Sequence, residues 1–529
     1  MTSEPVGSTE STESVPKVDN VVVVLLDSLN RHMLGSYGGT EFATPHLDRF
    51  AARSTRFTRH YTGSLPCMPA RHDILCGALD FLWKPWGSIE VWERPVTHDL
   101  REAEVTTMLV SDHPHLFETG GENYHTDFFA WDYVRGHEGD PWRTRPDPSW
   151  VGTPDAVAAP ARAGFFPHPY DMSRTWFRSE EDFPGPTTMQ RAADWLRTGA
   201  PDQGRWLLFV DEFDPHEPFD TPEPWRGRYD PDWDGNLIIW PPYDVGAVGK
   251  GRLSSREAHH IRANYGAKLS MIDHWFGRVL DALDDRGSWD TTAVIVCTDH
   301  GHYLGEKDIW GKPAVMQYEP LGHIPLMVHW PGSPPSTTCD ALTTNVDICA
   351  TLADVFGVAP EHRTHGVSLR PLLTGATTSV REWALGGVWG NWVQVTDGRH
   401  KYARGAVDRN FPLSMWSNRW TTMPVHGVSG LELPRPDHRA RLDTMPGTDV
   451  PVIRQPFTPG DRLPFWASDR SVDRHHLYDL ADDPAEDEDR AGAAAGTDAG
   501  LEAEMLDLLR TALDDVEAPD DQYHRLGLA

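Results

Sequence analysis

The segment 65–77, LPCMPARHDILCG, places Cys67, Pro69 and Arg71 in a C-x-P-x-R pattern. Proline suits the first turn of a helix, because the N–H that it lacks would have no partner there. The positive end of the helix dipole and the Arg71 guanidinium both favour an anion at position 67. The pattern therefore suits an oxyanion nucleophile, although five residues alone leave open a buried structural cysteine beside a surface arginine.

Asp27 and the neighbouring pair Asp299 and His300 offer two carboxylates and an imidazole to a divalent cation. Position 67 would supply a further ligand atom. Taken singly, Asp27 is also typical of a helix N-cap, and His300 of a hydrogen-bonded core histidine. The occurrence of all three in one chain favours a metal site.

Four apolar runs are expected to bring these residues together. Residues 21–26, 206–210, 293–297 and 324–329 are typical of parallel strands buried on both faces of a sheet. Three runs continue directly into polar clusters, namely LLDSLN, FVDEFDPHEP and IVCTDHGHYLGEK. Ligands bind beyond the carboxyl ends of strands in open parallel sheets, so we expect the three clusters to converge on one site.

The order of the elements predicts an α/β fold, a large mostly parallel sheet flanked by helices. Helical patterns at residues 45–54 and 258–285 separate the apolar runs, so strands and helices alternate. After residue 378, short strand-like pieces and a final amphipathic helix at 501–513 indicate a smaller C-terminal α+β subdomain.

We therefore divide the chain into a disordered tail at 1–18, a catalytic domain at 19–378 and a C-terminal subdomain at 379–529. Two segments, about 133–186 and 406–471, are rich in Pro, Trp, Gly and charge and show neither helical nor strand periodicity. They are expected to be insertions that cap the cleft.

The charge balance restricts the partners of the chain. Lys and Arg number 48 against 79 Asp and Glu, a net charge of −31 that repels nucleic acid and anionic membrane surfaces. A small anionic substrate is still allowed, because a few basic groups in a cleft can reverse the local potential. The N-terminus lacks the pattern of a secretory signal, no apolar stretch is long enough for a membrane helix, and five Cys make no disulfide framework. These features predict a cytoplasmic protein.

Beyond single motifs, the chain resembles the type I, formylglycine-dependent sulfatases of the alkaline phosphatase superfamily, in which the C-x-P-x-R cysteine is oxidised to formylglycine. The matches follow the family's order over nearly the whole chain: NVVVVLLDSLNRHMLGSYGG, residues 67–71, TDHGHYLGEKDIWGK, HIPLMVHWPG, DGRHKYAR and LYDLADDPAED. The resemblance implies an alkaline-phosphatase-like fold and maturation of Cys67 by a formylglycine-generating enzyme. The resemblance leaves the oligomeric state open, and a homo-oligomer is one option.

The resemblance also implies residue roles. Asp27, Asp299, His300 and the formylglycine at position 67 would hold one divalent metal ion, and Arg71 would stabilise the hydrated nucleophile. His216 in DEFDPHEPFD and Lys312 in IWGK match positions that hold the ester oxygen and the leaving-group side of the substrate. A turn histidine and a solvated surface lysine are the alternatives.

Two departures from the family pattern matter. Sulfatases usually carry a second Asp after the first and often Asn after the third, where this chain has Ser28 and His300. An imidazole ligand suits Mn²⁺ or another transition metal better than Ca²⁺, so the choice between Ca²⁺ and Mn²⁺ stays open. The usual G-K-W-H element is replaced by SDHPH at 111–115, so the substrate lysine is missing. We assign His113 to the nonbridging oxygens, with His115, Tyr124 and His125 as alternatives.

The predicted function is hydrolysis of a small-molecule sulfate ester. A phosphonate monoester or phosphodiester hydrolase with the same nucleophile is the first alternative, because the Asp, formylglycine, Asp, His set and YVRGHEGDPW at 133–142 resemble that branch. An inactive homologue that binds sulfated ligands is the second alternative. The intact nucleophile motif and metal set argue against it.

Overall fold

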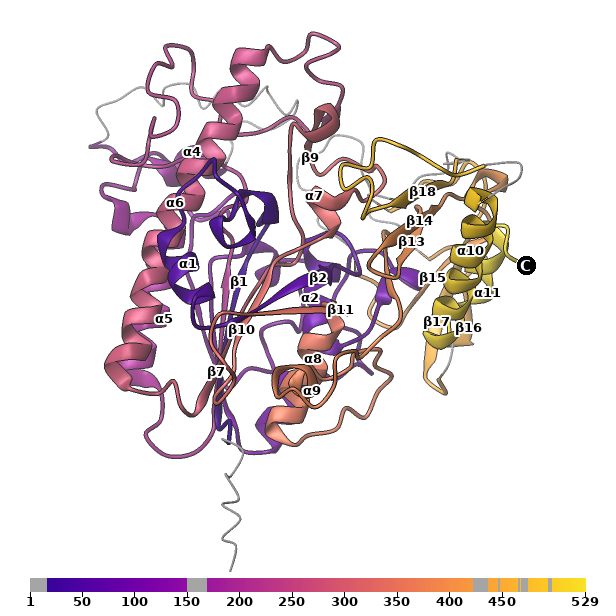
Figure 1. The fold of residues 1–529 in the computed structure, drawn as a ribbon, viewed down its shortest axis with the longest axis horizontal. Helices are drawn as coiled ribbons and strands as arrows, with labels where there is room; N and C mark the ends of the chain where they lie inside the picture. The colour runs from indigo at the N-terminus through magenta and orange to yellow at the C-terminus, as the bar shows by residue number, and fades with distance from the viewer. Residues whose placement is uncertain are drawn as a thin grey trace, which may run out of the picture.

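The computed structural model describes residues 17–149, 169–421, 436–445, 448–464, 467, 474–492 and 497–529. An eight-stranded sheet lies at the centre of the molecule, in the order β11-β2-β10-β7-β1-β5-β3-β4 (Figure 1). Its strands are β1 (Asn20–Leu26), β2 (Thr55–Tyr61), β3 (Thr106–Ser111), β4 (Ala130–Tyr133), β5 (Trp206–Glu212), β7 (Thr292–Cys297), β10 (Leu326–His329) and β11 (Thr337–Thr344). The sheet is mostly parallel, which confirms the predicted fold class.

One strand of the sheet runs against the others. β10 pairs antiparallel with β2, where Met327 lies opposite Arg56, and antiparallel with β7, where Met327 lies opposite Val296. The prediction that residues 324–329 form a parallel strand is therefore wrong in direction. An apolar run shows only that both faces of a strand are covered, and an interior antiparallel strand is covered in the same way.

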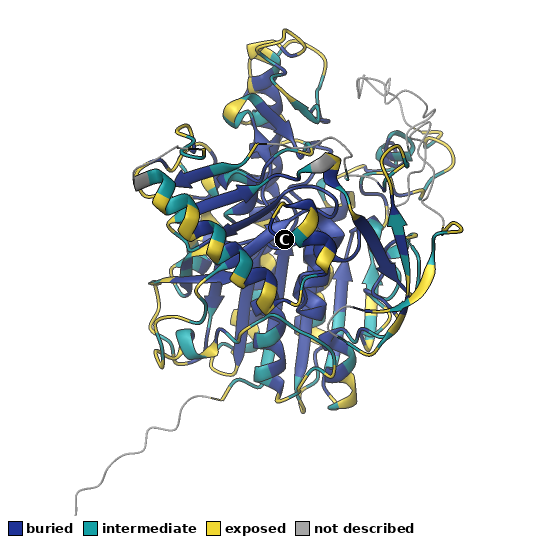
Figure 2. Cartoon of the chain, turned by 90° about the vertical axis from the view of Figure 1, so that its right-hand side faces the viewer, coloured by how far each residue is buried: buried dark blue, intermediate teal, exposed yellow. Residues whose placement is uncertain are grey.

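Two helical layers cover the sheet: α1 (Pro45–Ala51), α5 (Pro184–Asp194) and α6 (Ser255–Arg286) on one face, and α2 (Cys67–Cys76), α3 (Val96–Glu102) and α8 (Val346–Phe356) on the other. Val22 and Val24 of β1 pack against the first layer, and Val21 and Val23 against the second. Successive side chains of a strand point to opposite faces, so both faces need apolar residues. This is why the run is continuous, and Figure 2 shows the central strands as buried.

A second sheet, β12 (Ala384–Gly387), β13 (Val393–Thr396), β14 (His400–Arg404) and β18 (His476–Asp479), is antiparallel and lies beside the first in Figure 1. The helix α10 (Thr497–Asp515) covers it, and Leu509 and Leu513 belong to the same buried apolar cluster as Val395. An isolated bridge between Ser64 and Gly387 joins β12 to the segment that precedes α2. The second sheet therefore lies next to the segment that carries Cys67.

A three-stranded antiparallel sheet lies within residues 406–471, where we predicted no strand periodicity. It consists of β15 (Leu413–Ser417), β17 (Pro451–Phe457) and β16 (Arg441–Thr444). The absence of periodicity did not exclude strands here, because β15 is buried on both faces and β16 is largely exposed, so neither strand alternates. The remaining short elements are β6 (Asp244–Val245), β8 (Tyr303–Leu304), β9 (Ile309–Gly311), α4 (Pro169–Arg174), α7 (Glu319–Gly322), α9 (Arg370–Leu373) and α11 (Asp520–Arg525).

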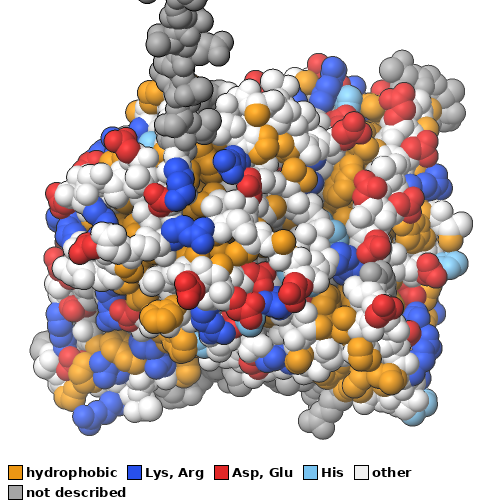
Figure 3. All heavy atoms as spheres, turned by 90° about the horizontal axis from the view of Figure 1, so that it is seen from below, with side chains coloured by type: hydrophobic (Ala, Val, Ile, Leu, Met, Phe, Trp, Pro, Cys, Tyr) orange, Lys and Arg blue, Asp and Glu red, His pale blue; other side chains and the backbone are white. Residues whose placement is uncertain are grey.

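Some predicted features lie outside the described residues, namely most of the tail at 1–18 and parts of the two insertions, at 150–168, 422–435, 446–447, 465–466 and 468–471. Within the described ranges, no helix is both long and apolar enough to cross a membrane. On the lower face of the molecule, acidic and basic side chains lie side by side (Figure 3). The net charge of −31 is therefore not gathered into a single patch on that face.

Candidate active site

The candidate site lies at the carboxyl ends of the central strands. Asp27 directly follows β1, Asp299 and His300 follow β7, and Cys67 is the first residue of α2. One ligand atom from each of these four residues lies within 4.8 Å of the others, and all four side chains are buried. The structure thus brings together the four residues predicted to hold a metal.

Cys67 lies where the sequence places a nucleophile. Its Sγ is 3.2 Å from His300 Nε2 and 3.6 Å from Lys312 Nζ. Burial, reinforced by the charge of Asp27, raises the pKa of the Cys67 thiol well above its usual range. An unmodified thiol at this position would stay protonated at neutral pH and would be a poor nucleophile.

Arg71, one turn after Cys67, is held by three buried carboxylates. Its Nη2 lies 2.9 Å from Asp27 Oδ2, and its Nη1 lies 2.8 Å from Asp299 Oδ2. Asp211, near the end of β5, accepts from Nε at 2.9 Å and from Nη2 at 2.7 Å. Our sequence reasoning missed Asp211, although the cluster FVDEFDPHEP that contains it was predicted to border the site.

Ser28, which replaces the second Asp of the family pattern, connects the metal ligands to Lys312. Its Oγ donates to Asp27 Oδ1 at 2.7 Å and accepts from Lys312 Nζ at 3.1 Å. Its backbone N–H donates to Asp299 Oδ1 at 3.1 Å. The residue adopts a φ of 61°, a left-handed conformation that is uncommon outside glycine.

The donor set fits a divalent cation. Asp27 is fully buried, and its Oδ2 faces Arg71 Nη2 at 2.9 Å and His113 Nε2 at 3.6 Å. Burial, reinforced by the charge of Asp27, raises the pKa of Asp299 to about 7, because two neighbouring buried carboxylates are costly to keep charged together. A divalent ion would offset that charge, and two carboxylates with an imidazole match the ligands that Mn²⁺ accepts.

A second group of buried side chains also has metal-binding types, but a lysine occupies it. His72, Asp80 and Glu93 lie within ligand distance of one another. Lys84 Nζ lies 3.0 Å from Asp80 Oδ2 and 3.0 Å from Glu93 Oε2. The ammonium therefore takes the place that a cation would need.

The two predicted substrate histidines border the site. His113 Nε2 lies 3.6 Å from Asp27 Oδ2, and the His113 ring contacts the ring of Phe213. His216 stacks on the same phenylalanine, with 4.2 Å between ring centroids. His216 Nδ1 lies 2.8 Å from the carbonyl oxygen of Glu217, which fixes the orientation of the ring.

His216 is neutral at pH 7, because burial lowers its pKa to about 4. Because its Nδ1–H donates to a carbonyl oxygen, Nε2 carries a lone pair. His216 can therefore accept a proton as a base does, whereas the resemblance implies an acid that donates one. Lys312 differs: against the effect of burial, the negative charges of the neighbouring Glu217 and Asp27 carboxylates raise its pKa. Lys312 is therefore the charged donor of the site.

Further residues that our sequence reasoning missed lie behind His216. The Glu217 carboxylate lies 3.4 Å from His216 Nδ1 and 3.3 Å from His302 Nε2 and accepts from the Tyr243 hydroxyl. Nothing in the spacing of these residues along the chain indicates the cluster, because Tyr243 comes from a separate segment. Of the alternatives to His113, His115 pairs with Glu118 and Glu138, and the Tyr124 hydroxyl donates to backbone carbonyls.

Comparisons with known proteins agree with this geometry. The sulfatase family model matches residues 19–358. The chain is 26% identical to the choline-sulfatase of Rhizobium meliloti over 74% of this chain and 78% of that protein. It is 24% identical to human iduronate 2-sulfatase, with 62% of each chain covered.

Solved structures show the same fold. The phosphonate monoester hydrolase of Agrobacterium radiobacter superimposes with a TM-score of 0.61 at 17% identity, covering 94% of this chain and 95% of that one. A protein solved with its substrate D-glucosamine-2-N,6-O-disulfate superimposes with a TM-score of 0.64 at 16% identity, covering 96% and 99%. Because the family model matches more than half of the sequence, this chain belongs to the sulfatase family, a family of sulfuric ester hydrolases.

Proposed function

We propose that the chain hydrolyses sulfate esters by covalent catalysis at position 67, with formylglycine derived from Cys67 and one divalent metal ion. The observation that carries the proposal is the convergence of Asp27, Cys67, Asp299 and His300 within 4.8 Å at the ends of two strands and a helix. The choline-sulfatase and iduronate 2-sulfatase relatives support sulfate as the group transferred.

Formylglycine would supply the nucleophile, and the divalent metal ion would neutralise charge. Formylglycine offers a hydroxyl in its hydrated form, and a divalent ion lowers the charge on the nonbridging oxygens of the ester. Asp27, Asp299 and His300 would hold the ion. Arg71, fixed by Asp211, would hold the oxygen of position 67 in the direction of attack.

Lys312 is proposed to assist the departure of the leaving alcohol. Its Nζ lies 3.6 Å from Cys67 Sγ, and Ser28 Oγ accepts one of its hydrogens. A proton donor beside the bridging oxygen lowers the barrier when the departing oxyanion is basic. His216, which is neutral, would accept a proton at Nε2 during the release of sulfate.

His113 is proposed to contact a nonbridging oxygen in place of the missing lysine. It is buried, and burial lowers its pKa well below the usual range, so it would act as a neutral hydrogen-bond partner. A neutral contact stabilises a monoanionic sulfate ester less than a lysine would. The missing lysine therefore removes one feature that favours sulfate esters over phosphorus esters.

A phosphonate monoester or phosphodiester hydrolase is the second candidate. The observation that favours it is His300, whose Nε2 lies among the proposed metal ligands where many sulfatases have an amide. The nucleophile, Arg71 and Lys312 would keep the same roles, because tetrahedral sulfur and phosphorus esters have similar sizes.

A side-by-side assay distinguishes these candidates. Protein produced with a formylglycine-generating enzyme would be given an aryl sulfate, a phosphonate monoester and a phosphodiester with the same phenol as leaving group. The highest kcat/KM for the aryl sulfate is the expected result. A higher value for either phosphorus ester would favour the second candidate, and tight binding of all three without turnover would indicate an inactive homologue.

A further inference from the structure

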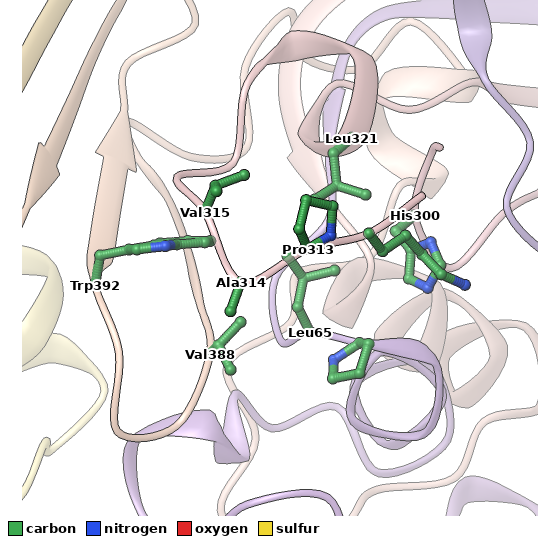
Figure 4. A pocket seen from close by; sticks show the side chains of 10 residues that line it. Leu65, His300, Pro313, Ala314, Val315, Leu321, Val388 and Trp392 are labelled. Carbon is green, nitrogen blue, oxygen red and sulfur yellow. The ribbon is translucent and has the colours of Figure 1, made fainter. Parts of the chain in front are cut away.

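Lys312, the charged donor of the candidate site, has few partners that fix its position. Among the described residues, its Nζ forms hydrogen bonds only with Ser28 Oγ at 3.1 Å and Cys67 Sγ at 3.6 Å. Residues 313–315, which follow it, line a small apolar hollow in which no described side chain carries a carboxylate or a hydroxyl (Figure 4). The Ser28 hydroxyl is therefore the one oxygen of the described chain that holds the ammonium beside position 67.

Ser28 holds the lysine from an uncommon backbone conformation. Its φ of 61° lies in the left-handed region, although the residue is not a glycine. A residue in this region persists only where the surrounding structure fixes it. Because the backbone angles determine where a side chain leaves the chain, a return to ordinary angles would displace the Ser28 hydroxyl from Lys312.

The turn after β1 is fixed by hydrogen bonds of its backbone. The N–H groups of residues 28 and 29 donate to Asp299 Oδ1 at 3.1 Å and to Thr298 Oγ1 at 3.2 Å, respectively. The Asn30 N–H donates to the Tyr265 hydroxyl at 2.9 Å. Three consecutive N–H groups of the turn thus have side-chain acceptors, two from the segment that follows β7 and one from α6.

Tyr265 makes two of the hydrogen bonds at this turn. Besides accepting from the Asn30 N–H, its hydroxyl donates to the carbonyl oxygen of Ser28 at 3.0 Å. The side chain is fully buried, and its ring packs edge-on to Phe219 with 5.4 Å between the ring centroids. Without this hydroxyl, two backbone groups of the turn would each lose a partner, and an unpaired buried backbone group is costly.

We propose that Tyr265 is a positioning residue for the candidate active site. Its hydroxyl holds Ser28 in the left-handed conformation, and Ser28 in turn places the Lys312 ammonium beside the leaving group. The proposal rests on the proposed function, because it concerns the proton donor that this function assigns to Lys312. It gives the long helix α6, through one hydroxyl, a part in the departure of the alcohol.

The first test is structural and needs no turnover. Tyr265→Phe removes one hydroxyl and keeps the ring, so the packing against Phe219 should remain. In crystal structures of the metal-loaded wild type and of this variant, the variant's Ser28 Oγ is expected to lie beyond about 3.5 Å from Lys312 Nζ, outside hydrogen-bonding distance. Retention of the Ser28–Lys312 hydrogen bond in Tyr265→Phe would overturn the proposal.

The second test uses the leaving-group dependence of the formylglycine-containing enzyme. Tyr265→Phe should slow esters of basic alcohols by about tenfold and esters of acidic phenols by less than about twofold, because a misplaced donor matters most when the departing oxyanion is basic. In the Lys312→Ala background, Tyr265→Phe should add less than about a twofold loss, since the residue through which it acts is gone. Losses that multiply in the double variant would contradict the proposal.

Tyr37→Phe is the matched control. The Tyr37 hydroxyl also donates to a backbone carbonyl oxygen, that of Leu326 at 2.8 Å, and accepts from the N–H of the same residue at 3.0 Å. Tyr37→Phe should lower the denaturation midpoint, as Tyr265→Phe should, and leave the leaving-group dependence unchanged. If Tyr265→Phe behaves like this control, Tyr265 is merely structural and the proposal fails.

The two tests separate this proposal from the proposed function. If Lys312→Ala shows no leaving-group dependence, the role proposed for Lys312 fails, and the crystal structures still decide whether Tyr265 positions Ser28. If Lys312→Ala shows the dependence and Tyr265→Phe does not, the proposed function stands and the inference about Tyr265 fails.

Discussion

Arg71 and Asp211 form a two-point ion pair, with Nε 2.9 Å from Oδ2 and Nη2 2.7 Å from Oδ1, and both side chains are buried. The pair joins the end of β5 to the second turn of α2. Such a geometry fixes the plane of the guanidinium. Since the remaining N–H groups of Arg71 face Asp27 and Asp299, Asp211 determines how the arginine meets the metal set and position 67.

Asp211→Asn should therefore lower both stability and activity. Removing one partner of a buried ion pair costs about 3–5 kcal/mol of unfolding free energy. Misplacement of Arg71 should lower kcat by roughly 100-fold, because the nucleophile loses its orientation. Asp220→Asn, which weakens the pairs of Asp220 with Arg174 and Arg226, is the matched control and should lower stability but not kcat. Retention of full kcat in Asp211→Asn would show that Arg71 needs no such support.

Activity should require one divalent metal ion at Asp27, Asp299 and His300. Rigorous chelation should abolish turnover, and Mn²⁺ should restore it better than Ca²⁺, because imidazole is a poor ligand for Ca²⁺. His300→Asn should shift this preference toward Ca²⁺ by replacing the nitrogen ligand with an oxygen ligand. Undiminished turnover by metal-free protein would rule out the proposed site.

Lys312 and His216 should respond differently to the leaving group. Lys312→Ala is expected to slow esters of basic alcohols more than esters of acidic phenols, by roughly 100-fold or more at the basic end. His216→Ala should slow the whole series equally, because His216, with its pKa lowered to about 4, is neutral at pH 7 and does not donate to the alcohol. Rate constants over a graded series of phenols and alcohols measure this. A steeper leaving-group dependence in His216→Ala than in Lys312→Ala would reverse the two roles.

The buried group around Lys84 should contribute to stability and bind no metal. His72 Nε2 lies 2.9 Å from Asp80 Oδ2 and 3.0 Å from Glu93 Oε2. Each of the two basic side chains, His72 and Lys84, therefore contacts both carboxylates. Lys84→Met leaves uncompensated buried carboxylates and should cost about 3–5 kcal/mol of unfolding free energy in denaturant titrations. Lys250→Met, at the surface, is the control. Two metal ions per wild-type chain in elemental analysis would contradict this interpretation.

The sequence predicted the central sheet well, because continuous apolar runs indicate strands that are covered on both faces. The run at 21–26 corresponds to β1 and the run at 293–297 to β7. The direction of β10 could not be predicted in the same way, since burial does not depend on direction. The small sheet at 413–457 was missed because strand pairing, and not periodicity, defines it.

The candidate site was predicted where the residue type itself carries chemistry, as at Cys67 and His300. Asp211 escaped notice because it is adjacent to Glu212 on β5, and only the three-dimensional arrangement shows which of the two faces Arg71. Ser28 was noted as the loss of a carboxylate. Its bridging role depends on the unusual φ of 61°, which no pattern in the sequence reveals.

Mass spectrometry of the peptide that carries position 67 tests the central claim most directly. Protein produced with a formylglycine-generating enzyme should show the aldehyde in place of the thiol, and the converted fraction should scale with specific activity across preparations. Cys67→Ala should have no turnover, because neither hydroxyl of the hydrated aldehyde can then form. Equal turnover by a preparation with wholly unmodified Cys67 and by a converted one would contradict the account.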